Sequence, residues 1–130
     1  MGTMDGISVR TFASGATRDT VEGKLDYRGF LSPLVLKCFA DYMHTYRIQT
    51  DKKVRASDNW KKGIPRVEYM KSLWRHFMDA ALIDEQANGG LATVVEVAAY
   101  REALCGIFFN AKGLLFELLM AELEDGEAHD

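Results

Sequence analysis

The chain has 130 residues, of which 48 % are hydrophobic and 27 % are charged, and its net charge is −3. This length fits one domain, and the composition is that of a globular protein rather than a disordered one. Two cysteines are too few for a disulfide-stabilised secreted fold and lack the spacing of a zinc site, so we expect free, buried thiols. We expect neither a secretory signal nor a membrane partner, because no apolar run approaches the roughly 20 residues that span a bilayer.

Charge is distributed unevenly along the chain. From Arg47 to Arg75 there are nine basic and three acidic residues, whereas from His76 to Asp130 there are two basic and eleven acidic ones. A basic middle attracts phosphate, while an acidic remainder repels a long polyanion. The pattern favours a small anionic ligand over duplex nucleic acid, although an ordinary unevenness of surface charge explains it as well.

Residues 1–31 are rich in Gly, Thr, Asp and Arg and show no sustained periodicity. We expect them to form an extended arm that packs on the body of the protein. A glycine-rich segment with Arg18 and Lys24 can wrap a phosphate through backbone N–H groups and cationic side chains. The segment lacks the spacing of a P-loop, and turns that tie the N-terminus to the body are the alternative interpretation.

Ser32 and Pro33 have the order of an N-cap followed by the first helical residue, and they predict a helix that ends near Arg47. Residues 48–65 then read as a polar loop. In this loop Asn59, Trp60 and Lys61 can hydrogen-bond, stack on and neutralise a nucleotide. The alternative is that the tryptophan only covers the helices.

A second helix is predicted from Pro65 to about Asp84. Four polar residues on it recur at helical spacing and therefore share one face: Ser72, Arg75, His76 and Asp79.

Thr93 and Glu96 have the spacing of a capping box and start a third helix, which we expect to reach about Glu122. The acidic segment 123–130 is expected to be a flexible tail. Within this apolar helix a line of small or polar residues recurs every three or four positions, at Glu102, Gly106, Asn110, Gly113 and Glu117. Such a line permits another backbone, or a ligand, to approach closely. The predicted fold is a single all-α bundle of three main helices with the N-terminal arm.

The polar faces of the second and third helices together offer the groups of a metal site. Asp79 and Glu102 can supply oxygen ligands to Mg²⁺ or Mn²⁺, with His76 or Asn110 completing the site. Arg75 then contacts a phosphate. The alternative is structural, with Arg75 paired to Asp79 one turn away and His76 held in the core by hydrogen bonds.

Four blocks of the sequence resemble a known family of small phage proteins. In order they are GATRDT-x-EGK-x-DY-x-GFLSPLVL, SDNW-x-KGIP, YMKSLWRHFMD and EALCGIFFNAKG, and together they cover most of the chain from Gly15 onwards. They are similar to the dATP/dGTP diphosphohydrolase N-terminal family, which is distantly like the all-α MazG-type pyrophosphohydrolases. The family positions carried over are Arg18, Asp19, Lys24, Asp26, Asn59, Trp60, Arg75, His76, Glu102 and Asn110.

The resemblance implies a phage-encoded protein that works in the bacterial host cytoplasm. It implies hydrolysis of purine deoxynucleoside triphosphates to monophosphate and pyrophosphate with a divalent metal. The MazG-type enzymes hold their metals with an ExxE pair and a later ExxD, and this sequence has no such pair in its helical body. A protein that binds a nucleotide without hydrolysing it is therefore the alternative. We also expect a homo-oligomer, because two partner helices cannot cover the apolar third helix.

Overall fold

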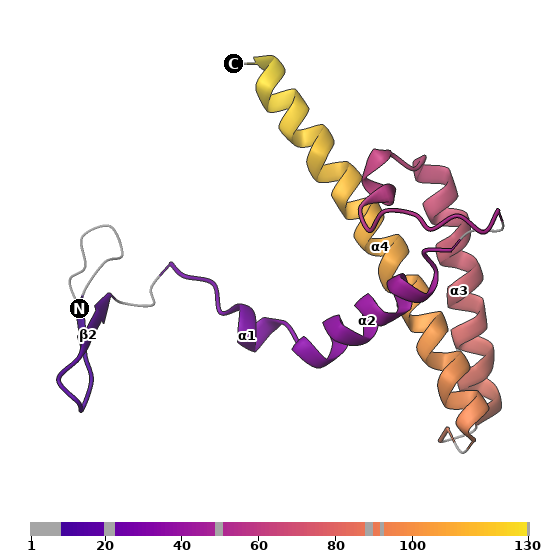
Figure 1. Ribbon diagram of the computed structural model, residues 1–130, viewed down its shortest axis with the longest axis horizontal. Helices are drawn as coiled ribbons and strands as arrows, with labels where there is room; N and C mark the ends of the chain where they lie inside the picture. Colours follow the sequence, from indigo (N-terminus) through magenta and orange to yellow (C-terminus); the bar gives the residue numbers. More distant parts are fainter. Residues whose placement is uncertain (1–8, 20–22, 49–50, 88–89, 92, 130) are drawn as a thin grey trace. The chain divides into compact units, whose positions relative to one another are not determined.

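The computed structural model describes residues 9–19, 23–48, 51–87, 90–91 and 93–129. Helices dominate this part of the chain, and a small two-stranded sheet accompanies them, so the predicted all-α class is confirmed (Figure 1). The chain divides into two units, Met1–Leu36 and Lys37–Asp130.

The first unit contains a β-hairpin and a short helix. Strands β1 (Val9–Thr11) and β2 (Thr17–Asp19) pair antiparallel. Gly15 adopts a φ of 91° in the turn between them, a conformation that glycine reaches without steric cost. The helix α1 (Tyr27–Phe30) follows. The predicted arm, residues 1–31, therefore has more regular structure than expected. Its residues 1–8 and 20–22 lie outside the described part. The packing of the arm on the body of the protein stays a prediction.

Helix α2 (Pro33–Thr45) begins where the sequence predicts it. The backbone N–H of Val35 donates a hydrogen bond to Oγ of Ser32 at 3.2 Å, which is the expected N-cap interaction. The helix ends at Thr45, two residues before the predicted end near Arg47.

The predicted polar loop contains local structure that composition did not signal. Ile48 and Val54 form an antiparallel bridge, and the N–H of Arg55 donates to the carbonyl oxygen of Arg47 at 2.7 Å. We call this segment, residues 47–55, the arginine hairpin; its residues 49–50 lie outside the described part. A 3₁₀ helix, η1 (Asn59–Lys62), follows and carries Trp60.

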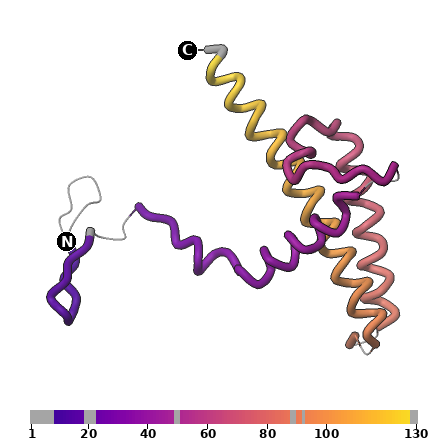
Figure 2. Tube along the Cα trace, viewed as in Figure 1, coloured from indigo at the N-terminus to yellow at the C-terminus, as the bar shows by residue number. Residues whose placement is uncertain are grey.

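Helices α3 (Arg66–Ala87) and α4 (Val94–His129) run side by side along much of α3, and the trace in Figure 2 shows α4 continuing past it. The capping box is confirmed: the N–H of Glu96 donates to Thr93 Oγ1, and the N–H of Thr93 donates to Glu96 Oε2. The acidic segment expected to be a flexible tail continues α4 as far as His129. Between α3 and α4, residues 88–89 and 92 lie outside the described part.

The line of small residues on α4 faces α3 and lets its rings approach. A Cβ atom added at Gly106 would overlap the His76 ring, and one added at Gly113 would overlap the Tyr69 ring. Asn110, 2 % exposed, donates hydrogen bonds to Ser72 Oγ at 3.1 Å and to the Gly106 carbonyl at 2.8 Å. The line is thus a packing surface between two helices, which is one of the two roles its spacing allows.

The length and hydropathy of α4 bear on the expectation of no membrane partner. Within Val94–Glu127 an 18-residue window has a mean hydropathy of 1.6, so by length and composition alone this helix could cross a bilayer. Length and composition alone cannot distinguish such a helix from the core helix of a soluble bundle. The sequence has no unbroken apolar run of this length, because polar residues are spaced along α4. The absence of a membrane partner stays a prediction.

Cys38 and Cys105 are free thiols, as predicted, with Cys105 buried and Cys38 half-buried. Burial, followed by the neighbouring Cys38 thiol, raises the pKa of Cys105. A raised pKa keeps the thiol protonated and unreactive, which fits a packing role.

Candidate functional site

A pocket of about 630 Å³ lies among α2, the arginine hairpin, η1 and α4, all within the second unit. We call it the aromatic pocket. Its ring-bearing and basic residues are Phe39, Tyr42, His44, Tyr46, Trp60, Phe109, Arg47, Arg55 and Lys112. The volume is in the range of sites that hold a drug-sized ligand, and no carboxylate is among the residues that line it.

Trp60 is fixed in the aromatic pocket by α4. Its indole makes an edge-to-face contact with Phe116, with ring centroids 4.8 Å apart, and the ammonium nitrogen of Lys112 lies 3.3 Å from its centroid. Phe109 and Phe39 surround the same ammonium at 5.5 and 5.6 Å. Burial, and then the nearby charge of Lys61, lowers the pKa of Lys112. The pocket thus contains a cation that is partly stripped of water.

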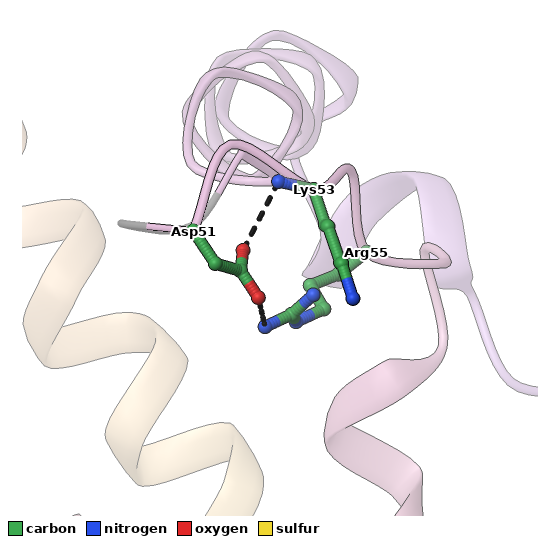
Figure 3. Close-up of polar contacts among 3 residues, drawn as sticks. All are labelled: Asp51, Lys53 and Arg55. Atoms are coloured by element: carbon green, nitrogen blue, oxygen red, sulfur yellow. Dashed lines mark hydrogen bonds and ion pairs between the residues drawn. The ribbon is translucent and has the colours of Figure 1, made fainter.

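The two arginines of the pocket are positioned by the arginine hairpin. Figure 3 shows Asp51 accepting hydrogen bonds from the Lys53 N–H and from Arg55 Nη2, each at 3.0 Å. The first of these bonds, and then the guanidinium, lowers the pKa of Asp51. The Nε–H of Arg47 donates to the Arg55 carbonyl at 2.9 Å, so its terminal N–H groups stay available for an anion.

A second pocket, of about 520 Å³, lies between α3 and α4 beside Tyr42 and Tyr46. We call it the acidic pocket, because Asp79 and Glu102 line it together with His76. The predicted meeting of these three residues is therefore found. The Tyr46 hydroxyl donates to Glu102 Oε1 at 2.8 Å, and this hydrogen bond is the main cause of a raised pKa at Tyr46.

The metal expectation can be tested against the donors of the acidic pocket. No group of three or more His, Cys, Asp or Glu side chains is close enough to hold a metal ion within the described ranges. Two carboxylates nevertheless line one pocket, and Mg²⁺ commonly binds to one or two carboxylates together with the phosphates of its substrate. The binding of Mg²⁺ or Mn²⁺ at the acidic pocket therefore stays a prediction.

The two pockets adjoin, because Tyr42 and Tyr46 line both of them. The two tyrosine rings pack against each other with centroids 4.8 Å apart. Burial and then the neighbouring Tyr46 raise the pKa of Tyr42, so its hydroxyl is neutral at physiological pH. The two tyrosines are therefore a shared wall between an aromatic, cationic region and an acidic one.

The remaining predicted site residues lie elsewhere. Arg75 is exposed on α3 and lines neither pocket. The alternative interpretation, an ion pair between Arg75 and Asp79, is not found among the described residues. Asn110 is enclosed between α3 and α4, so the packing role replaces the predicted ligand contact. Asn59 and Trp60 both line the aromatic pocket, and Lys61 lies 5.7 Å from the same indole.

Arg18 and Lys24 belong to the first unit, Arg18 in β2 opposite Arg10 and Lys24 shortly before α1. Their predicted phosphate contacts stay predictions.

Several residues of the pockets were not identified from the sequence, among them Tyr42, Tyr46, Arg47, Arg55 and Lys112. Lys112 did carry a signal, since it stands within the apolar stretch of α4 and a lysine there needs a special environment. The arginines carried none, because a bridge between Ile48 and Val54 brings them together without a glycine or asparagine turn signature.

A further face of α4 is exposed and apolar. Leu115, Leu118, Leu119 and Leu123 recur at helical spacing and are between 47 % (Leu119) and 61 % (Leu123) exposed. This leucine stripe is the part of the helix on which the expected homo-oligomer depends, and the oligomer stays a prediction.

Comparison with known proteins adds no relative: no protein-family model, no curated protein and no solved structure matches this chain. The family resemblance read from the four sequence blocks therefore stays a prediction, and the function must be argued from the pockets.

Proposed function

We propose that this protein binds a purine (deoxy)nucleoside triphosphate and hydrolyses it to the monophosphate and pyrophosphate. The observation that carries the proposal is the junction of the two pockets, one lined by aromatic rings and cations and the other by two carboxylates and a histidine. A nucleotide combines a flat aromatic base with a metal-binding polyanion, so it has both complements. The resemblance of the sequence to a phage nucleotide hydrolase agrees with this choice.

The aromatic pocket supplies the binding energy in this proposal. A base gains from stacking on Trp60 and from a hydrogen bond to Asn59, both of which line the pocket. Arg47 and Lys112 contribute positive charge for the phosphates, and a guanidinium can contact phosphate oxygens in pairs. Arg18, Lys24 and Arg75 line neither pocket, and their contacts to phosphate stay predictions.

The acidic pocket supplies the chemical step. Asp79 and Glu102 would hold one Mg²⁺ or Mn²⁺ together with phosphate oxygens, and such an ion polarises phosphate and stabilises negative charge. The oxygen of a water molecule bonds to the α-phosphorus, and the bond to the bridging oxygen breaks as pyrophosphate leaves with the electron pair. The proton of the water passes to a carboxylate or to the His76 imidazole. Tyr46, through its hydrogen bond to Glu102, fixes the orientation of that carboxylate.

The direct test is release of pyrophosphate from dATP and dGTP by the purified protein with Mg²⁺ or Mn²⁺, and again after removal of the metal with a chelator. We expect Asp79→Asn and Glu102→Gln each to abolish turnover while leaving nucleotide binding within a few-fold. Asp84→Asn is the matched control, because Asp84 is an exposed carboxylate on the same helix and lines neither pocket. Equal activity in all three variants would remove the acidic pocket from the mechanism.

A non-hydrolysing nucleotide-binding protein is the second candidate, and one observation favours it. One oxygen of Glu102 already accepts a hydrogen bond from Tyr46, and the described residues offer two acidic ligands rather than the four of a multi-metal site. Such a protein would sequester a nucleotide in stoichiometric amounts. Calorimetry followed by recovery of the ligand from the denatured complex distinguishes the two, since an intact triphosphate after long incubation with metal supports sequestration.

A further inference from the structure

The indole face that a base would stack on is covered by a side chain of the protein. Lys112 Nζ lies 3.3 Å from the Trp60 centroid, and both residues line the aromatic pocket. A stacked base needs the same space above the ring. A ligand can therefore stack on this face only after the ammonium has moved away.

The ammonium of Lys112 is well suited to move toward an anion. It lies among three aromatic rings, and no carboxylate pairs with it within the described residues. Contact with the indole gives part of the stabilisation that water or a carboxylate would give. The four-carbon stem of lysine is flexible, so the charge can change partner without movement of α4.

We propose that Lys112 is a specificity residue that admits phosphorylated nucleotides to the aromatic pocket and rejects unphosphorylated nucleosides and bases. A nucleotide phosphate gives the ammonium a new partner when it leaves the ring, and the base then stacks on the freed indole. A nucleoside must displace the same ammonium without offering it a counter-charge. The inference rests on the proposed nucleotide site, and it adds that selection occurs at the base-stacking position as well as at the phosphates.

The experiment measures one ratio, the affinity for dAMP or dATP relative to that for deoxyadenosine, without metal. Trp60 fluorescence reports binding in a Trp74→Phe background, because the chain has two tryptophans. The same titrations are made with Lys112→Met, which keeps the length of the stem and removes the charge. Lys71→Met is the matched control, since Lys71 is an exposed lysine on α3 that lines neither pocket.

We expect Lys112→Met to bind deoxyadenosine about tenfold more tightly and the nucleotides about tenfold more weakly, so that the ratio falls about 100-fold. Lys71→Met should leave the ratio unchanged, and Lys112→Arg should preserve most of it. A Lys112→Met ratio equal to that of the unsubstituted protein, or matched by Lys71→Met, overturns the inference while leaving the nucleotide site in place. If the unsubstituted protein binds neither ligand, the proposed function itself fails. Thermal unfolding of each variant shows that it is folded, and Lys112→Gln, which also removes the charge, carries the comparison should Lys112→Met unfold.

Discussion

Helix α4 has two sides that meet the rest of the second unit in different ways. On the side that faces α3, Gly106 and Gly113 receive the rings of His76 and Tyr69, and no room remains at these two positions. On the side that faces η1 and the arginine hairpin, Phe109, Lys112 and Phe116 project, and a pocket of about 630 Å³ remains.

The difference shows how one helix can separate structure from function. Small residues allow a neighbouring helix to close on the backbone, which is favourable for stability and leaves no space for a ligand at the two glycines. Large rings and a lysine on the other side hold η1 and the hairpin away from the backbone, and what lies between is lined by groups that recognise aromatic anions. Substitutions at the closely packed positions should change folding, and substitutions among the rings and cations of the aromatic pocket should change binding.

The largest effect is expected at the glycine that receives the Tyr69 ring. Gly113→Ala places a methyl group inside that ring, and we expect a loss of about 3 kcal/mol in the free energy of unfolding, as for an overpacked core. Gly126 is a matched control, because it lies in the same helix and nothing would contact its Cβ. Gly126→Ala should stabilise by about 0.5–1 kcal/mol, since alanine loses less backbone freedom than glycine. Urea unfolding measures both, and equal shifts would mean that the α3 side is not closed.

The next effect concerns Asn110, which the sequence offered as a ligand contact and the structure encloses between the helices. Asn110→Ala removes its hydrogen bonds to Ser72 and to the Gly106 carbonyl, and we expect a cost of about 2 kcal/mol. Nucleotide affinity should stay within a few-fold. A double-mutant cycle with Ser72→Ala measures the coupling of the pair. A large loss of affinity in a folded Asn110→Ala protein would return this residue to the binding site.

These contrasts also show which parts of the molecule the sequence can predict. The three helices followed from local signals, namely the Ser32 cap, the Thr93–Glu96 capping box and the apolar periodicity, because these depend on near neighbours. The meeting of His76, Asp79 and Glu102 followed from helical spacing on two helices that must pack together. Spacing could not decide whether a polar line faces a helix or a ligand, which is why Asn110 was misplaced.

The aromatic pocket could not be predicted in full, for a physical reason. Its cations come from α4 and from the arginine hairpin, and the hairpin turns through Lys52 with a φ of 66°, a conformation for which lysine gives no sequence signal. Asn59 and Trp60 were found because an aromatic residue beside an amide is a local pattern. Lys112 needed knowledge of which face of α4 meets Trp60.

A smaller effect concerns the leucine stripe, which belongs to neither side of the comparison. An antiparallel pair of α4 helices centred on Leu118 would cover the stripe in both copies. We therefore expect a dimer by light scattering at micromolar concentration, and Leu118→Lys should weaken it at least about tenfold, a change of about 1.4 kcal/mol. Met78→Lys is the control, since Met78 is 58 % exposed on α3. A monomeric mass for the unsubstituted protein would contradict the oligomer.

The smallest change in the free energy of unfolding near neutral pH is expected for Tyr69→Phe. At alkaline pH the same substitution should change how stability depends on pH. The Tyr69 hydroxyl is buried and has no hydrogen-bond partner among the described residues, so its removal should change stability by less than about 0.5 kcal/mol. Burial, and then the charge of Glu117, raises the pKa of Tyr69 above its ordinary value of 10.0. Above that value the unfolded chain loses this proton before the folded protein does, so the stabilising contribution, fully present below pH 10.0, is lost as the pH rises through the folded pKa.

The measurement is the free energy of unfolding in urea between about pH 8 and pH 11. Across the upper part of that range, Tyr69→Phe should lose less stability than the unsubstituted protein. Tyr42 and Tyr46, whose pKa values are also raised, keep their part of the alkaline loss in the variant. Lys112 acts in the opposite direction, because its lowered pKa makes stability rise with pH up to its ordinary value of 10.5, and this part should disappear in Lys112→Met. Identical alkaline profiles for Tyr69→Phe and the unsubstituted protein would mean that water reaches the hydroxyl, and the distinction between a sealed side and an open side of α4 would then be lost.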